Sequence, residues 1–282
     1  MSATHLSGSF VIIITSLLSV IIGCSGSKAE KSDRVTEESS PIVAFCRAID
    51  YTDTVSLHND KKMQATMTDI VKLMLKSDSI EIDKGLRYFF DGLNGDKKSL
   101  GLAFHYADLY LRDPQSPVKN GKLYLQFLQF LLQTPDLPEA MSEKAKEEMR
   151  TTKLNLEGST ANDFRYIDRN GNTGSLHAIS ARHTMLIFYD PECPHCPEIL
   201  KKIANDRGAN RAIDSGDLMV LAVYAEGKRD VWEKTKHELP QNWTVAYDLT
   251  GVLDADLYDL PAMPIVYLLD ADKTVVIKDM PW

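Results

Sequence analysis

The spacing of apolar residues changes once along the chain, and this change limits what the chain can fold into. Up to about Leu156, apolar residues recur every three or four positions, as on one face of a helix. After Leu156, short and nearly continuous apolar runs, such as residues 184–189, alternate with amphipathic segments. A first half without strands and a second half with alternating strands and helices predict two domains, one all-helical and one α/β.

Four apolar stripes of helical spacing define the first domain, which we place at residues 41–156. They lie at residues 67–75, 86–93, 102–111 and 123–132. Glycine, asparagine and proline separate them, and a more charged helix is expected at residues 138–154. The aromatic residues of the stripes are interpreted as core. Cys46, on the apolar side of residues 42–46, is expected to be a buried thiol.

The second domain, residues 157–282, has an α/β pattern that ends in a hairpin. A first hairpin is predicted around the glycine-containing turn at residues 168–172. The expected strands are 184–189, 218–224, 243–248, 265–269 and 274–278, and the expected helices are 194–205, 229–238 and 252–258. The final hairpin makes the predicted sheet mixed, with flanking helices.

The N-terminus has the layout of a targeting segment. The apolar run at residues 10–22 is shorter than the roughly 20 residues of a membrane-spanning helix, but it fits the core of a secretory signal. It ends in Ile-Ile-Gly-Cys24, which resembles a bacterial lipobox and implies a signal at residues 1–24 with lipid on Cys24. Residues 1–9 lack the usual lysine or arginine. The alternative is a buried apolar helix with an incidental cysteine.

Polar residues follow this segment, and the overall charge is acidic. Residues 25–40 cannot bury enough apolar surface to fold, so a flexible tether is predicted. Together the signal, the lipidated cysteine and the tether predict a lipid-anchored protein in the envelope of a Gram-negative bacterium, facing the periplasm. A net charge of −8, without a basic stripe, excludes nucleic acid as an expected partner.

The motif Cys193-Pro194-His195-Cys196 lies where a predicted buried strand meets a predicted helix. Cys193 is expected at the helix N-terminus, where free N–H groups favour a thiolate. Pro194 fits an early helical position, which needs no N–H donor. Protonated His195 would favour the thiolate further, whereas the carboxylate of Glu192 would oppose it. Cys196 is within reach to release a mixed disulfide.

The cysteine pair could instead belong to a zinc site or form a purely structural disulfide. A zinc site normally needs four ligands, and the sequence has no second C-x-x-C, although His177 and His183 are possible contributors. A purely structural disulfide between cysteines this close in sequence adds little stability through loop closure. We therefore expect no metal and no cofactor.

The order of strand, C-P-H-C, helix and a late Met263-Pro264 resembles the thioredoxin superfamily, over residues 158–279. The resemblance implies a thioredoxin-like fold in which the bond before Pro264 is cis and faces the cysteines. It also implies that Met263 and Pro264 hold an extended substrate segment. The surroundings are similar to the extracytoplasmic TlpA/ResA-like branch, and the tetrapeptide to that of DsbA. The helical half resembles an uncharacterised domain that precedes thioredoxin-like domains in envelope lipoproteins.

The sequence departs from this family at three points. Ile187 occupies a position where many thioredoxins carry an acid, and Glu192 replaces the usual aromatic residue just before the first cysteine. The closing helix of the fold is expected to be missing from residues 157–282, so that either the N-terminal bundle covers the sheet face or the sequence is shortened. Separately, Asp190 stands where a peroxiredoxin has threonine or serine, which disfavours peroxidase activity.

These residues predict an envelope thiol–disulfide oxidoreductase. Cys193 would attack and Cys196 would resolve, and the partners would be protein thiols or disulfides and a redox partner protein. Whether it acts as an oxidant, a reductant or an isomerase is left open. The alternatives are a non-catalytic scaffold and a metal-handling protein that uses Cys193, Cys196 and His195.

Overall fold

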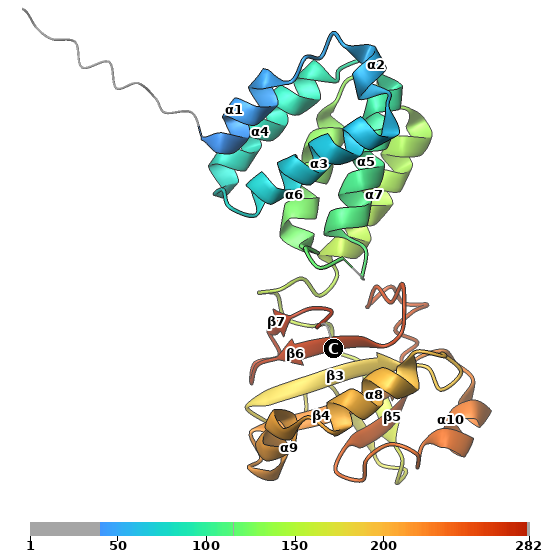
Figure 1. Cartoon of the computed structure of the whole chain (residues 1–282). Coiled ribbons are helices and arrows are strands. Elements are labelled where there is room, and N and C mark those ends of the chain that lie inside the picture. Colours follow the sequence, from blue (N-terminus) through green and yellow to red (C-terminus); the bar gives the residue numbers. More distant parts are fainter. Residues whose placement is uncertain (1–39, 115, 281–282) are drawn as a thin grey trace, which may run out of the picture. The chain divides into compact units, whose positions relative to one another are not determined.

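A computed structural model describes residues 40–114 and 116–280 (Figure 1). The predicted signal, the lipobox cysteine Cys24 and nearly all of the tether lie outside these residues. Within them, no helix combines the length and the apolar content that crossing a membrane requires. The chain forms helices up to residue 153 and a sheet from residue 165 onward, so the change of pattern near Leu156 does separate the two kinds of structure.

Over residues 40–114 and 116–156, the helical half contains seven helices. They are α1 (Pro41–Ala48), α2 (Thr54–Leu57), α3 (Asp60–Met74), α4 (Ser79–Gly92), α5 (Lys97–Leu111), α6 (Gly121–Gln133) and α7 (Glu139–Lys153). Asn59, Asp78, Asp96 and Asn120 each accept a backbone N–H in the first turn of the following helix. Such caps satisfy donors that have no partner within the helix. The short helix α2 was not predicted.

The apolar stripes meet in one core, as the helical spacing predicted. Leu86, Phe89 and Phe127 are fully buried, and so is Cys46, which confirms the expected buried thiol. Helix α1 crosses closely over α4 at Gly85, where a Cβ atom would lie 2.8 Å from Ile42 Cγ1. This close approach is the physical reason for glycine in the middle of α4.

Up to residue 280, where the described chain ends, the second half is built on one mixed sheet of seven strands. They are β1 (Arg165–Asp168), β2 (Thr173–Ser175), β3 (His183–Tyr189), β4 (Leu218–Tyr224), β5 (Thr244–Asp248), β6 (Ile265–Leu269) and β7 (Val275–Ile277), in the spatial order β2-β1-β5-β4-β3-β6-β7. Strands β3, β4 and β5 are parallel, whereas β6 runs antiparallel to β3. The predicted mixed sheet is confirmed.

The central strand β3 is buried on both faces. Leu186 and Phe188 contribute to the core on one face of the sheet, and Met185, Ile187 and Tyr189 to the core on the other. This alternation follows the two-residue period of a strand. Helix α8 (Cys196–Ala204) covers the second face and contributes Cys196, Leu200 and Ile203 to its core.

Three elements of this half differ from the sequence prediction. Helix α9 (Arg207–Asp214) was missed, and α10 (Arg229–Thr235) ends three residues early. The helix predicted at 252–258 is wrong, because the chain there forms turns. The Asp248 carboxylate accepts N–H groups from Thr250 and Val252, and Asp256 adopts a left-handed φ of 52°. Both features oppose a continuous helix.

Residues 278–280, which follow β7 in the described chain, hold no helix. Instead the Met280 N–H donates to the Val266 carbonyl, so the chain continues alongside β6. Lys278 donates its Nζ to the Leu154 carbonyl at 2.8 Å. The end of the described chain is thereby tied both to the sheet and to the residues that follow α7.

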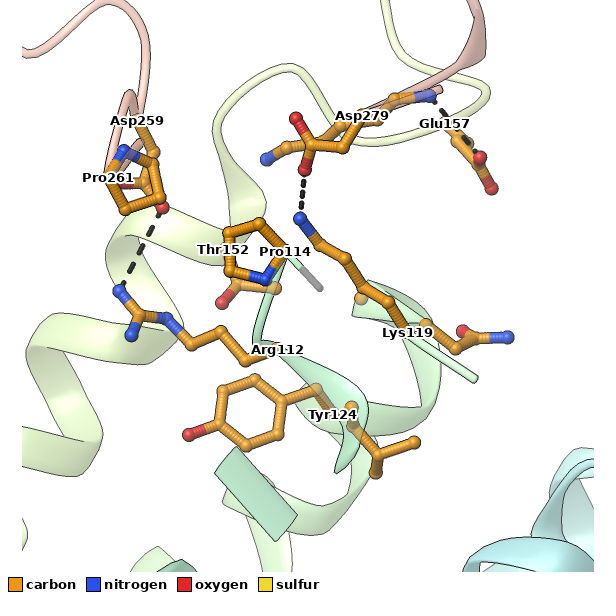
Figure 2. A pocket seen from close by; sticks show the side chains of 13 residues that line it. Arg112, Pro114, Lys119, Tyr124, Thr152, Glu157, Asp259, Pro261 and Asp279 are labelled. Carbon is orange, nitrogen blue, oxygen red and sulfur yellow. Dashed lines mark hydrogen bonds and ion pairs between the residues drawn. The ribbon is translucent and has the colours of Figure 1, made fainter. Parts of the chain in front are cut away.

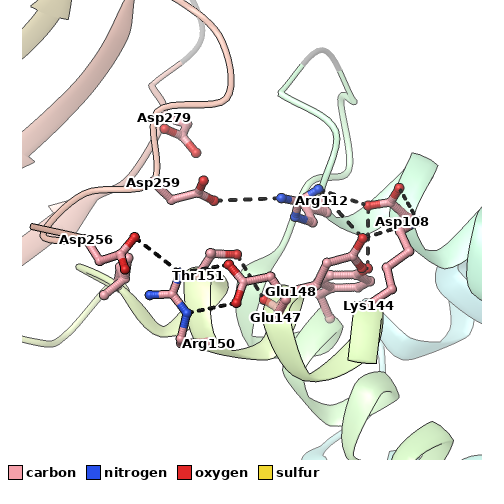
Figure 3. Close-up of polar contacts among 12 residues, drawn as sticks. Asp108, Arg112, Lys144, Glu147, Glu148, Arg150, Thr151, Asp256, Asp259 and Asp279 are labelled. Carbon is pink, nitrogen blue, oxygen red and sulfur yellow. Dashed lines mark hydrogen bonds and ion pairs between the residues drawn. The ribbon is translucent and has the colours of Figure 1, made fainter. Parts of the chain in front are cut away.

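Charged side chains of the helical half contact the segment between β5 and β6 (Figure 3). Arg112, which follows α5, lies 4.0 Å from Asp259 and near Glu148 and Asp108. Arg150 of α7 pairs with Asp256 at 3.3 Å. A cavity of about 110 Å³ is lined by both residues of the first of these pairs (Figure 2). These contacts connect the helical half to the chain that leads into Pro264.

Candidate functional site

The motif lies in a turn between β3 and α8. The Asp190 carbonyl accepts the Cys193 N–H at 3.1 Å, and the Asp190 carboxylate accepts the Glu192 N–H at 2.9 Å. Helix α8 begins only at Cys196, with His195 at the N-cap position, so the placement of Cys193 at the first turn of the helix is wrong.

Pro194 therefore lies outside the helix, in the exposed turn. The early helical position that suits a proline is taken by Pro197 instead. Of the two prolines, the second and not the first lies in the first turn of the helix. As a result, Cys193 precedes the helix by three residues.

The two cysteines of the motif have different environments. Both are free thiols, but Cys193 is partly exposed whereas only 1% of Cys196 is accessible. Burial raises the pKa of the Cys196 thiol to about 12. One thiol of the pair can therefore meet a partner protein, while the other is held protonated in the core.

Sheet topology brings Met263 and Pro264 to this turn. Because β6 runs antiparallel to β3, its first residue, Ile265, pairs with Phe188 near the end of β3. The Cys193 Sγ donates to the Met263 carbonyl oxygen at 3.3 Å, and the Met263–Pro264 bond is cis. The cis bond and its position facing the cysteines are as the resemblance implied. The contact joins residues 70 positions apart.

Two charged residues near the motif have defined surroundings. The Glu192 carboxylate forms an ion pair with Lys228 at 2.6 Å, and both side chains are more than half exposed. His195 is exposed and makes no capping hydrogen bond. Lys228 thus offsets part of the negative charge of Glu192 beside the thiol.

Lys228 was missed in the sequence, although a signal for it exists. Strands β3 and β4 are parallel neighbours, so the residues that follow them meet at the same edge of the sheet. Glu192 follows β3 by three residues and Lys228 follows β4 by four. Topology together with opposite charge could have predicted the pair.

The histidines considered for zinc are placed elsewhere. The Nε2 atom of His177 lies 2.7 Å from the Ala161 carbonyl oxygen, and His183 is the first residue of β3, at the opposite end of that strand from the motif. Over residues 40–114 and 116–280, no three His, Cys, Asp or Glu side chains are grouped as a metal site would require.

The β5–β6 segment, residues 249–264, is held in place from several sides. Asn155, only 3% exposed, donates its Nδ2 to the Leu257 carbonyl at 2.7 Å and accepts the Asn162 N–H at 2.7 Å. The Tyr258 hydroxyl donates to the Asn162 carbonyl at 2.6 Å. The segment that carries Met263 to Cys193 is thus fixed by buried polar contacts that lie far from the motif in sequence.

Two protein families match the chain, one for each half. Residues 45–155 match a domain family of unknown function, DUF5106, and residues 158–278 match the AhpC/TSA family. The curated proteins contain no match to the chain.

Among solved structures, a thioredoxin-like protein from Bacteroides caccae is similar to both halves. It is 26% identical, the match covers 88% of this chain and 92% of that one, and the TM-score is 0.78. The fold is thioredoxin-like. The helical half and the sheet half therefore also occur together in a second protein of this architecture.

Two further structures match one half of the chain. A conserved protein of unknown function from Bacteroides fragilis is 35% identical, covering 44% of this chain and 92% of that one, with a TM-score of 0.43. The thioredoxin domain of a thiol-disulfide oxidoreductase from Bacteroides vulgatus is 20% identical, covering 45% and 90%, with a TM-score of 0.39.

Proposed function

We propose that this protein is a thiol–disulfide oxidoreductase that exchanges disulfides with cysteine pairs of other proteins. One observation carries the proposal. A partly exposed Cys193 contacts the carbonyl before a cis-proline, with a buried, protonated second thiol in the same motif. This arrangement provides a nucleophile, a surface for the attacked chain and a resolving group.

In the reducing direction the exchange proceeds in two steps. The Cys193 thiolate attacks one sulfur of a substrate disulfide, a Cys193–substrate bond forms, and the other substrate sulfur leaves as a thiolate that takes up a proton. Cys196 then loses its proton and attacks Cys193. The mixed disulfide breaks, the second substrate thiol is released, and the Cys193–Cys196 disulfide remains. Two electrons pass to the substrate, and the reverse sequence oxidises a dithiol.

We further propose that the chain works in the Gram-negative envelope, tethered by lipid on Cys24 and facing the periplasm. The support lies in the sequence, where a short apolar segment ends in the lipobox-like Ile-Ile-Gly-Cys24 and a polar stretch follows. Disulfide exchange between proteins is permitted in that compartment. A second envelope protein would restore the redox state of the cysteine pair.

The resolving role of Cys196 predicts which variant traps substrate. The full-length Cys196→Ser chain, incubated in detergent with a disulfide-bonded test protein such as insulin, should accumulate a mixed disulfide that reducing agent releases. The Cys193→Ser chain should accumulate none, because the exposed nucleophile is gone. Non-reducing electrophoresis with mass spectrometry of the adduct measures both.

Two outcomes would favour the other interpretations. If neither variant forms an adduct and the unmodified chain reduces no insulin, the thioredoxin-like half is a scaffold. If the purified chain carries zinc that is lost in the Cys193→Ser and Cys196→Ser variants, the pair handles metal.

A further inference from the structure

A groove of about 800 Å³ opens beside the reactive thiol. It is lined by His195, Ile199 and Lys202, from the N-cap position and body of α8. Met263 and Pro264 also line it, and the Met263 carbonyl oxygen is the one that accepts the hydrogen bond from Cys193. When a cysteine of a substrate protein reaches Cys193, the residues that flank it in the substrate therefore come close to this groove.

Residues of the helical half also line this groove. Pro114, Ser116, Pro117 and Lys119, from the loop between α5 and α6, line it together with the α8 and β6 residues. Pro114 and Pro117 are exposed. The groove beside the cysteine motif is thus lined partly by residues of the helical half.

Residues 116–120, which precede α6, are held by hydrogen bonds and an ion pair. The Ser116 hydroxyl donates to the Tyr110 carbonyl at 2.5 Å, and the Asn120 N–H donates to the Leu111 carbonyl at 2.9 Å. Lys119 forms an ion pair with Asp279 (Figure 2). A surface that is ordered before binding loses less conformational entropy when a partner docks on it.

Most charges that line the groove already have partners within the chain. Lys119 pairs with Asp279, and Lys202 pairs with Glu198 at 2.9 Å. The Nζ of Lys278 donates to a backbone carbonyl. The unpaired part of the lining is largely apolar and includes Ile199, Ile265, Ile277, Met263, Met280 and the two loop prolines. Such a lining favours neutral, apolar side chains over charged ones.

We propose that Pro114 and Pro117 of the helical half are part of the substrate-binding surface and favour protein substrates whose reactive cysteine is flanked by apolar residues. This inference rests on the proposed function. It gives the helical half a direct role in choosing the partner, at the exposed Pro114 and Pro117.

The test measures mixed-disulfide formation in the full-length Cys196→Ser chain. The probes are eight-residue peptides with a central cysteine, activated as a neutral thiopyridyl disulfide and flanked either by leucine and valine or by lysine. The Cys193 thiolate attacks the peptide sulfur, the Cys193–peptide bond forms and pyridinethione leaves. Free dithiodipyridine serves as the small neutral disulfide, and the chain that also carries Cys193→Ser corrects for reaction at the other cysteines.

The decisive variant carries Pro114→Glu and Pro117→Glu in the Cys196→Ser chain. The rate constant with the apolar peptide should fall at least about fivefold, because each carboxylate would lose hydration beside apolar partners. The rate with the lysine peptide should rise, because opposite charges attract. The rate with dithiodipyridine should not change, because that small probe needs only the thiol.

The matched control carries Val55→Glu and Ile80→Glu, which add the same charge at exposed positions of the helical half outside the groove. It should leave all three rates unchanged. If the ratio of apolar to lysine peptide rates is the same in the proline variant, the control and the parent chain, this inference is wrong. If Cys193 forms no mixed disulfide with any probe, it is the proposed function that fails.

Discussion

At the scale of single residues, the account depends on the contrast between the thiols. Cys193 is partly exposed and contacts a backbone carbonyl, whereas Cys46 and Cys196 are buried in the cores of the two halves. Burial raises the pKa of each buried thiol to about 12. Since only thiolates attack efficiently, reactivity should be confined to Cys193 among these three.

Alkylation should therefore be selective. With brief exposure of the reduced protein to iodoacetamide at pH 8, Cys193 should be modified well before Cys46 and Cys196. A thiol of pKa about 12 is only about 0.01% ionised at that pH. Peptide mass spectrometry measures the order, and modification of Cys196 ahead of Cys193 would contradict the assignment of roles.

The same burial predicts how stability depends on pH. A thiol whose pKa is higher in the folded than in the unfolded chain stabilises the fold fully at pH values below the unfolded pKa of about 8.5, and this contribution is lost as pH rises toward the folded pKa. For Cys46 that window ends at about pH 12. The Cys46→Ala chain should therefore lose less unfolding free energy than the parent between pH 8.5 and 10.5, in urea titrations. If the unfolding free energies of the parent and the Cys46→Ala chain fall equally over this pH range, the Cys46 thiol is not buried.

Glu192 and Lys228 should act in opposite directions on Cys193. Replacement of Glu192 by glutamine removes a negative charge near the thiol, and alkylation of Cys193 at pH 7 should speed up about two- to threefold at low salt. Lys228→Gln leaves Glu192 without its partner and should slow the reaction by a similar factor. Both effects should shrink in high salt, because the pair is exposed. If Cys193 is alkylated at the same rate in the parent, Glu192→Gln and Lys228→Gln chains, Glu192 does not influence the thiol.

At the scale of elements, the central question is how the β5–β6 segment is kept beside the motif. It contains turns instead of the predicted helix, so its position depends on side chains from elsewhere. The buried Asn155 side chain makes one hydrogen bond to Leu257 of this segment and one to Asn162. Its backbone has a left-handed φ of 50°. Asparagine is one of the few residues with a side chain that tolerates this backbone conformation.

Two variants of Asn155 separate its backbone role from its side-chain role. Asn155→Gly keeps the left-handed backbone accessible and should cost about 1–3 kcal/mol of unfolding free energy, through the lost buried hydrogen bonds. Asn155→Ala should cost about 1 kcal/mol more, since alanine resists that backbone. The exposed ion pair of Arg150 and Asp256 supplies the control, because Asp256→Asn should change stability by less than about 0.5 kcal/mol. Urea denaturation measures these changes. If the Asn155→Gly chain is as stable as the parent, the Asn155 side chain does not hold the β5–β6 segment in place.

At the scale of the whole molecule, the sequence predicted the architecture better than the details of the site. Continuous apolar runs located the buried strands β3 and β4, and helical stripes located the long helices. Alternation of strands and helices predicted an α/β sheet, the final hairpin predicted that it is mixed, and the resemblance added the cis bond before Pro264. The strands and helices follow from local patterns, which depend on few distant contacts.

The features that escaped prediction depend on tertiary contacts or on competing local bonds. Helix α9 has no fully buried residue and thus only a weak apolar signal. Asp248 redirects the backbone where a helix was expected. The pairing of Glu192 with Lys228 and the reach of Asn155 to Leu257 join residues 36 and 102 positions apart. The loop at Pro114 and Pro117 had no sequence feature that connected it to the motif.

The proposed activity requires that Cys193 and Cys196 form a reversible redox couple. The most direct measurement is the reduction potential of this pair in the full-length chain, equilibrated against glutathione or dithiothreitol buffers and read by alkylation and mass spectrometry. The account predicts a single two-electron transition involving these two thiols, between about −120 mV for an oxidant and −270 mV for a reductant. A pair that shows no reversible oxidation at any buffer potential would contradict it.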